Sequence, residues 1–200
     1  MSDLESLWLT QALKGNAEAF GNLIEMYQTP VYNLCYRMLG DPYDAEDAAQ
    51  EAFMRAYKGL KRYDRSRSFS TWLLSIAAHY CIDQIRRRRY TLVSVDDNPQ
   101  IDIVDGDPGP EAETLNSERQ AKVQAMLAGL SPQDRAAVVM RYWYDFSYEE
   151  IAESLSLTVS AVKSRLHRAR RDLAQNWVDE TSKAASVERK SHGNAQSPAF

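Results

Sequence analysis

The sequence is poor in the residues that mark secreted, membrane-spanning or loop-rich proteins. Its 200 residues include only 2 Cys, 8 Gly and 7 Pro. No apolar run approaches the roughly 18 residues that a membrane-spanning helix needs, and the first ten residues carry Asp3 and Glu5 rather than the basic start of a secretory signal. Cys35 and Cys81 lie within apolar helical patterns and lack metal-ligand spacing. We therefore expect a cytoplasmic protein without membrane insertion, in which both cysteines are reduced core residues.

The sequence also lacks the motifs on which enzymes depend. It contains no Gly-rich phosphate loop, no carboxylate cluster with metal-ligand spacing, and no nucleophile paired with a base. His167 has no second ligand near it at helical spacing, so it does not predict a metal site. We expect no enzymatic activity, no cofactor and no metal.

Positive charge is scarce overall, but it is strongly segregated. The net charge of −4 would by itself argue against a nucleic-acid binder. Residues 90–118 contain no Lys or Arg, whereas acidic residues, Pro and Gly are frequent there. This composition predicts an acidic flexible linker over residues 91–118, for which a soluble spacer is the default interpretation. The linker separates two units, residues 1–90 and 119–176.

Both units have the periodicity of helices rather than strands. In the first unit, apolar spacing predicts a helix that is interrupted at Pro30 and ends at Gly40. A second helix is predicted with Asp44 as its cap, and a third begins near Ser70. In the second unit, a break at residues 131–132 separates two short helices. The predicted fold class is all-α, with two small helical domains.

The most informative stretch is residues 147–173, which has the pattern of a helix-turn-helix. Ser147 followed by Glu150 is a capping-box pattern, and Thr158 can cap a longer second helix. In that second helix, apolar residues are predicted to point inward and small and basic residues outward, as major-groove recognition requires. We expect residues 177–200, which lack an apolar face, to form a disordered tail.

A basic helix face can also be a merely solvated surface, and a helix-turn-helix serves many proteins. The conjunction of a short capped helix, a tight turn and a second basic helix favours DNA binding over solvent. A free-standing transcription regulator remains an alternative, and it predicts tight DNA binding without any polymerase.

Four segments together resemble extracytoplasmic-function sigma factors of bacterial RNA polymerase, which belong to the sigma-70 family. Residues 147–155 (SYEEIAESL) and 162–170 (VKSRLHRAR) are similar to region 4 of that family. Residues 44–53 (DAEDAAQEAF) resemble its region 2.2, and residues 69–77 (FSTWLLSIA) its region 2.3, in the expected order. The resemblance implies a sigma factor that binds core polymerase and directs promoter-specific initiation. It would recognise the −35 and −10 elements and assist DNA melting.

The resemblance implies DNA contacts in both units. The residues expected at the −35 element are Lys163, Ser164, Arg165, His167, Arg168 and Arg171, with Arg165 and Arg171 on phosphates. The residues expected at the −10 element and in melting are Phe69, Trp72, His79, Arg86, Arg87 and Arg88. Phe69 and Trp72 equally suit a hydrophobic core. His79 stands where many members carry Asn, and Ser156 where the turn usually carries Gly.

The resemblance also implies protein partners. Asp47, Gln50, Glu51 and Arg55 would bind the clamp helices of the polymerase's largest subunit, and region 4 the flap of the second-largest subunit. An anti-sigma factor is expected to cover the polymerase-binding faces. In this family the acidic linker resembles a segment that passes through the active-site and RNA-exit channel, where its charge would mimic RNA.

Overall fold

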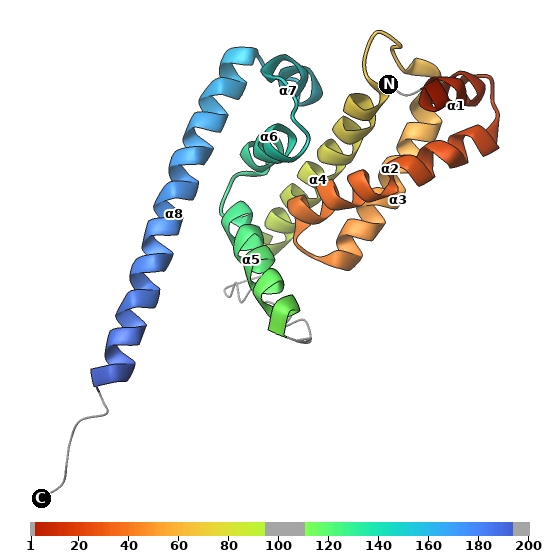
Figure 1. Cartoon of the computed structure of the whole chain (residues 1–200). Helices are drawn as coiled ribbons and strands as arrows, with labels where there is room; N and C mark the ends of the chain where they lie inside the picture. Colours follow the sequence, from red (N-terminus) through yellow and green to blue (C-terminus); the bar gives the residue numbers. More distant parts are fainter. Residues whose placement is uncertain (1–2, 95–110, 194–200) are drawn as a thin grey trace, which may run out of the picture.

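The computed structural model describes residues 3–94 and 111–193, which Figure 1 draws in colour. All regular structure in these two ranges is helical, as the sequence predicts, and none of their helices is long and apolar enough to cross a membrane. The elements in chain order are α1 (Asp3–Leu13), α2 (Ala17–Leu39), α3 (Pro42–Gly59), the short 3-10 turn η1 (Leu60–Arg62), α4 (Phe69–Ser94), α5 (Glu111–Ala128), α6 (Pro132–Trp143), α7 (Tyr148–Ser154) and α8 (Val159–Gly193).

Helices α1 to α4 form an N-terminal bundle around one apolar core. The inward stripe of α3 is almost entirely alanine, with Ala45, Ala52 and Ala56 fully buried. Small side chains allow the backbones of neighbouring helices to approach closely, and α3 packs against both α2 and α4. Cys35 and Cys81 are buried in this core and not bridged, as expected.

The ends of α2 and α3 follow from local chemistry. Gly40 adopts the left-handed conformation (φ 84°) that ends α2. The cap of α3 is Asp41 and not Asp44: the Asp41 side chain accepts a hydrogen bond from the Asp44 amide at 2.9 Å. The prediction of Asp44 was wrong because Pro42, which favours the first helical position, sets the start of the helix three residues earlier than the apolar stripe suggests.

Helix α1 was not predicted from the sequence. It is short, but it is anchored to α2 through Glu5, which is buried and accepts a hydrogen bond from the Tyr27 hydroxyl at 2.7 Å. Burial and this carboxylate hold the pKa of Tyr27 well above its usual range. The hydrogen bond joins residues that are far apart in sequence, so no local sequence pattern predicts it.

Helices α5 to α8 form the C-terminal unit, and two of them are longer than predicted. Helix α5 begins at Glu111, inside the predicted linker, and α8 continues to Gly193 through the predicted tail. Neither extension contains an internal Pro or Gly, so intrinsic propensity suffices to continue helices whose other ends are packed. The disordered tail was therefore wrong for residues 177–193. Residues 95–110 of the linker and 194–200 of the tail lie outside the described residues.

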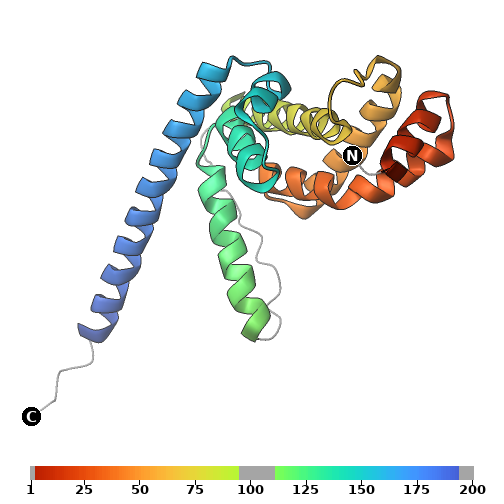
Figure 2. The ribbon, with the colours of Figure 1, turned by 45° about the horizontal axis from the view of Figure 1, so that its top comes forward.

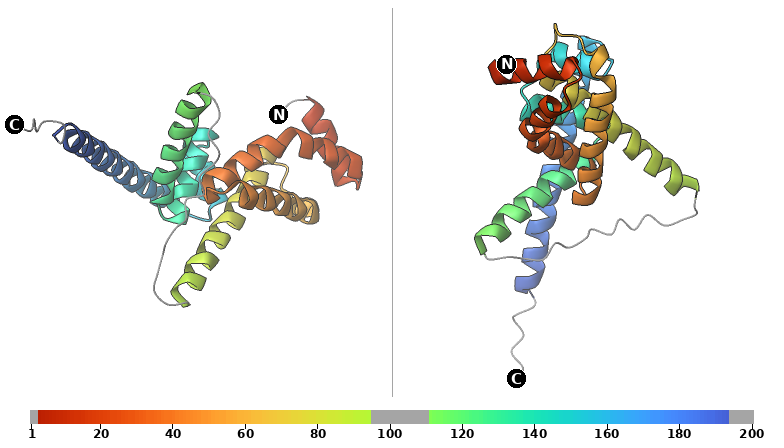
Figure 3. Two further views of the ribbon diagram at one scale, coloured as in Figure 1. Left: turned by 90° about the horizontal axis from the view of Figure 1, so that it is seen from below. Right: turned by 90° about the vertical axis from the view of Figure 1, so that its right-hand side faces the viewer.

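The C-terminal unit rests on the N-terminal bundle. Helix α6 contacts α2 and α4, α7 contacts α4, and α5 contacts α2. Figure 2 shows α6 and α7 between the bundle and α8. Helix α8 itself projects away from the rest of the molecule (Figure 3), so its basic beginning lies close to the bundle and its end far from it.

Candidate nucleic-acid and polymerase interfaces

The helix-turn-helix predicted from the sequence is formed by α7 and the first part of α8. The capping box is complete: the Glu150 amide donates to Ser147 Oγ at 3.1 Å, and the Ser147 amide donates to Glu150 Oε2 at 2.8 Å. In the turn, Ser156 adopts a left-handed conformation with φ 55°. Thr158 Oγ1 then accepts from the Ala161 amide at 3.1 Å and starts α8. The caps confirm the predicted starts of both helices.

The first turns of α8 have one buried and one exposed face. Val162, Leu166 and Ala169 are buried against α6 and α7. The opposite face is open to solvent and carries the predicted −35 residues other than Arg165, namely Lys163, Ser164, His167, Arg168 and Arg171. This face is cationic and begins with the small residue Ser160, as a helix that enters the major groove requires.

Two arginines of α8, Arg165 and Arg170, form hydrogen bonds within the chain. Arg165 donates to Asp134 Oδ1 at 2.8 Å and to Gln133 Oε1 at 2.7 Å, both on α6. These bonds occupy its guanidinium, so Arg165 ties α8 to α6 in this structure instead of pointing at a phosphate. Arg170 donates its Nε to the Leu166 carbonyl at 3.2 Å and lines an apolar groove.

Among the predicted −10 residues, the two aromatic ones belong to an aromatic cluster in the bundle. Phe69 is 1% exposed and packs edge-on against Tyr27 and Tyr63, with ring centroids 5.5 and 5.6 Å away. Trp72 is half-buried over Tyr63 at 5.0 Å. Phe69 therefore cannot stack on a base in this conformation, which resolves the choice between core and DNA in favour of the core.

The remaining −10 residues lie on the exposed side of α4. His79 is exposed, and its Nδ1 lies 2.9 Å from the Ser75 carbonyl, so its Nε2 is the ring nitrogen directed away from the helix. Arg86 and Arg87 are exposed. Arg88 forms an ion pair with Asp44 of α3, and this hydrogen-bonded carboxylate raises the pKa of Arg88 above its usual value. The arginine run is thus partly neutralised within the chain.

The polar face of α3 carries the residues expected to bind polymerase. Asp47 and Gln50 are exposed. Glu51 and Arg55 pair with each other at 2.8 Å, and the Arg55 guanidinium lies 4.7 Å above the ring of Tyr80 on α4. All four predicted residues therefore share one accessible face, on which Glu51 and Arg55 are preorganised by their mutual pair.

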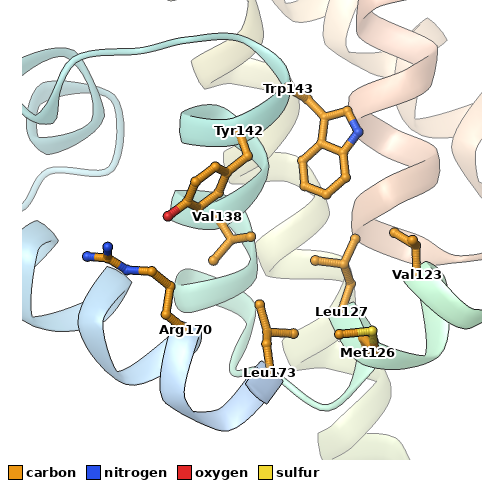
Figure 4. A pocket seen from close by; sticks show the side chains of 8 residues that line it. All are labelled: Val123, Met126, Leu127, Val138, Tyr142, Trp143, Arg170 and Leu173. Atoms are coloured by element: carbon orange, nitrogen blue, oxygen red, sulfur yellow. The ribbon is translucent and has the colours of Figure 1, made fainter. Parts of the chain in front are cut away.

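A groove that sequence reasoning missed lies between α5, α6 and α8 (Figure 4). Its volume is about 260 Å³, and apolar side chains dominate its wall. Tyr142 and Trp143 are 52% and 39% exposed, which is unusual for large apolar side chains. The only sequence signal was the excess of large apolar residues on α6 beyond those that one buried face requires. The lining residues are Val123, Met126, Leu127, Val138, Tyr142, Trp143, Arg170 and Leu173.

The two ranges that the structure describes contain no group of His, Cys, Asp and Glu able to hold a metal ion. Their accessible chemistry is a cationic helix face, a basic helix end, a polar helix face and an apolar groove. Such surfaces bind DNA and protein partners.

Comparisons with known proteins assign the two units to one family. The sigma-70 region 2 model matches residues 23–91, and the sigma-70 region 4 model matches residues 120–173. The chain is 36% identical over 178 residues to the ECF RNA polymerase sigma factor SigW of Bacillus subtilis, covering 86% of this chain and 95% of SigW. It is 32% identical over 167 residues to the RNA polymerase sigma-H factor of Pseudomonas aeruginosa, covering 78% of this chain and 85% of that protein.

Two solved structures have a similar fold. The structure of CnrH in complex with the cytosolic domain of CnrY superposes with a TM-score of 0.65 at 25% identity, covering 88% of this chain and 99% of CnrH. The sigma factor RpoE from Bartonella quintana, in complex with the anti-sigma factor NepR, superposes at a TM-score of 0.63 and 20% identity, covering 80% of this chain and 96% of RpoE.

The fold and its surfaces define a two-domain, helix-turn-helix transcription factor. The chain belongs to the extracytoplasmic-function group of the sigma-70 family, and it acts as a sigma factor in transcription initiation by RNA polymerase. The alternative of a free-standing regulator is not favoured, because such a regulator does not account for the region 2 match over α2, α3 and α4.

Proposed function

We propose that promoter specificity of this sigma factor depends on the exposed face of α8. The main support is that Lys163, His167 and Arg168 are exposed on a helix whose other face is buried and whose start is capped by Thr158. Lys163 and Arg168 can donate to guanine O6 and N7, and Ser164 and His167 can contact neighbouring base edges. Arg171 lies further along the same face and contacts a phosphate.

Reconstitution with core polymerase tests this proposal. We expect that initiation from the promoter requires this chain. We also expect that initiation is lost when Lys163 and Arg168 are both changed to Ala. The matched control is Lys14→Ala, which removes an exposed basic residue of the α1–α2 turn, distant from α8. Equal transcription by both variants would contradict the assignment.

At the −10 element, the exposed side of α4 is the proposed contact surface. His79 Nε2 is oriented toward solvent and can hydrogen-bond to an unstacked base, while Arg86 and Arg87 follow the backbone. Trp72, half-buried, acts by supporting this surface. Extruding a base costs a few kcal/mol, and several contacts along α4 together offset that cost.

For the polymerase, we propose two docking surfaces. The polar face of α3 with Asp47, Gln50, Glu51 and Arg55 binds the clamp helices of the largest subunit. The apolar groove between α5, α6 and α8 receives the flap of the second-largest subunit, because an exposed apolar groove on a DNA-binding unit fits a protein partner (Figure 4).

Core binding separates these assignments. Gln50→Ala combined with Glu51→Ala is expected to weaken core affinity, because it removes two groups from the polar face of α3 without touching the core of the bundle. Trp143→Ala is expected to weaken binding of the isolated flap. Unchanged core affinity of the Gln50→Ala, Glu51→Ala variant would refute the clamp-helix assignment. Unchanged flap binding of Trp143→Ala would refute the assignment of the groove to the flap.

Two further proposals concern regulation and the linker. An anti-sigma factor is a partner, since the matched structures of CnrH and RpoE are complexes with other proteins, which for RpoE is the anti-sigma factor NepR. The acidic residues between positions 96 and 118 mimic RNA in the exit channel. If changing those acids to Ser leaves abortive synthesis and promoter escape unaltered, the linker's charge has no such role.

A further inference from the structure

A carboxylate of α6, that of Asp134, faces the basic beginning of α8. The start of α6 fixes its orientation: Asp134 Oδ2 accepts a hydrogen bond from Ser131 Oγ at 2.7 Å, and the same Ser131 Oγ accepts from the Asp134 amide at 3.2 Å. This cap leaves Asp134 Oδ1 for other partners. The Asp134 side chain is only 15% exposed, so Oδ1 is largely shielded from water.

Asp134 Oδ1 meets two arginines on neighbouring turns of α8. Arg165 Nη1 donates to it at 2.8 Å, while Arg165 Nη2 donates to Gln133 Oε1 at 2.7 Å. Arg168 Nη2 lies 3.9 Å from the same oxygen, which makes an ion pair but is too long for a hydrogen bond. One fixed carboxylate therefore holds Arg165 firmly and Arg168 loosely.

The two arginines differ in what they can still bind. Arg165 is hydrogen-bonded at both amino groups, and its side chain is partly buried. The Arg168 side chain is 54% exposed, and its long contact leaves its donors open to DNA. An exposed ion pair adds little to stability. Its effect here is on orientation, because a nearby negative charge restricts where a long, flexible cation points.

Lys163, the other cation proposed to read a base, has a different neighbour. Its Nζ lies 5.8 Å from the centroid of the Tyr148 ring on α7, which is a neutral group. Arg171 lies further along α8, where its Nε is 3.7 Å from the exposed carboxylate of Asp172, the next residue in the sequence. Arg168 differs from both because its carboxylate partner is held in place by another helix.

A carboxylate beside a DNA-binding face has two physical consequences. It repels phosphates, which lowers the affinity for every DNA sequence alike. It also draws the Arg168 guanidinium away from the phosphates, while leaving its donors free for a guanine edge in the major groove. Since base contacts carry sequence information and phosphate contacts do not, both consequences favour specificity over affinity.

We propose that Asp134 is a positioning residue for promoter recognition, which holds Arg168 in line with a base of the −35 element and away from the phosphates. The restraint supplies in advance part of the ordering that a free arginine side chain undergoes on binding. It also disfavours the competing phosphate contact, which every DNA sequence offers. This inference rests on the base contact of Arg168 proposed above.

Competition binding of the holoenzyme to single-base −35 variants, at constant salt, tests this role. Asp134→Asn keeps the shape of the side chain and an acceptor for Ser131, but it removes the charge. We expect discrimination between the best and the poorest base to fall about three- to tenfold, while affinity for the poorest variant stays the same or rises. A merely structural loss would instead lower the affinity for all variants alike and leave their ratio unchanged.

The matched control is Gln133→Ala. It removes the other acceptor of Arg165 but leaves the carboxylate of Asp134 in place. We expect its discrimination to equal that of the parent, because Arg168 keeps its partner.

Combined substitutions show whether Asp134 acts through Arg168. With Arg168→Ala already present, Asp134→Asn should change discrimination by less than about twofold, because the side chain that it positions is gone. With Lys163→Ala present, Asp134→Asn should still lower discrimination about three- to tenfold. An equal effect of Asp134→Asn with and without Arg168 would overturn the proposal, and so would unchanged discrimination in Asp134→Asn alone. If Arg168→Ala by itself leaves discrimination intact, the proposed base contact is wrong, and this inference is wrong with it.

A measurement on the parent chain decides the matter if circular dichroism shows that Asp134→Asn does not fold. NMR relaxation of the arginine Nε–H groups reports how far each side chain is restricted. We expect a higher order parameter for Arg168 than for Arg171, because Asp134 is fixed by the cap of α6 whereas Asp172 is exposed. Equal order parameters for the two arginines would overturn the proposal.

Discussion

Helices α4 and α8 both carry proposed DNA contacts, yet they use their sequences differently. In α8 the predicted basic residues mostly lie on an exposed face, and only Arg165 is hydrogen-bonded to α6, since the ion pair of Arg168 with Asp134 is long, at 3.9 Å. In α4 the predicted aromatic residues pack in or against the core, with Phe69 buried and Trp72 half-buried, and Arg88 is paired with Asp44. A basic residue on the outer face of an amphipathic helix remains exposed and can bind DNA. An aromatic residue on the inner face of a helix is instead buried by packing in the core.

The comparison predicts that substitutions of the aromatic residues of α4 act mainly on stability and substitutions of the exposed basic residues of α8 mainly on DNA affinity. The largest expected effect is that of Phe69→Ala, which removes a ring packed against Tyr27, Tyr63 and Trp72. We expect a loss of about 3 to 5 kcal/mol in the free energy of unfolding. Urea denaturation measures it, and His79→Ala on the exposed side of α4 should remain within about 0.5 kcal/mol of the parent. A stable Phe69→Ala protein that fails only in DNA melting would reverse the roles assigned here.

Next in size is the effect of Arg168→Ala on promoter discrimination. Arg168 is more than half exposed and its pairing with Asp134 is long, at 3.9 Å, so its guanidinium is available to a base. Loss of a bidentate contact to guanine costs about 1 to 3 kcal/mol, so discrimination at one −35 position should fall about 5- to 150-fold. Competition binding of holoenzyme to single-base promoter variants measures this.

Arg171→Ala is the counterpart of Arg168→Ala on the same face. As a phosphate contact, Arg171 should contribute similarly at every promoter, and its loss should reduce the slope of log affinity against log salt by about 1. If both variants change affinity uniformly across promoter sequences, Arg168 does not read a base.

Local sequence patterns correctly predicted the features that depend on residues close together in the sequence. The capping box of Ser147 and Glu150, the cap at Thr158 and the buried stripe of α8 were all readable from spacing. Spacing could not show that Asp134 lies opposite Arg165, 31 residues away, because that contact depends on how α6 packs on α8. The groove between α5, α6 and α8 escaped prediction for the same reason.

Other differences arose where two explanations fit one residue. Phe69 suited both core and base stacking, and only packing with Tyr27 and Tyr63 decides between them. The sequence from residue 177 on lacks an apolar face, which predicts no packed side but does not exclude a helix. Apolar periodicity therefore predicts which helices pack, and propensity decides how far they continue.

The pairing of Arg165 provides a finer test of the contrast between the helices. Arg165→Met should remove two hydrogen bonds to α6 and lower the free energy of unfolding by about 1 to 2 kcal/mol, allowing for the partial exposure of the pair. Its effect on the salt dependence of promoter binding should be small beside that of Arg171→Ala. A large change in salt slope with unchanged stability would restore Arg165 to the phosphate contacts predicted from the sequence.

The smallest expected effect concerns the turn between α7 and α8. Ser156 has φ 55°, in the left-handed region where a side chain costs free energy that Gly avoids. Ser156→Gly should therefore stabilise the protein by about 0.5 to 1 kcal/mol, because relief of the left-handed backbone outweighs the greater freedom of the unfolded chain. Asp145→Gly, at φ 53° before α7, is the matched control for a left-handed residue outside the turn. Thermal unfolding compares them, and a stabilised Ser156→Gly with unchanged promoter affinity would show that the turn only positions α8. Reduced affinity despite higher stability would mean that the Ser156 side chain itself contributes to DNA binding.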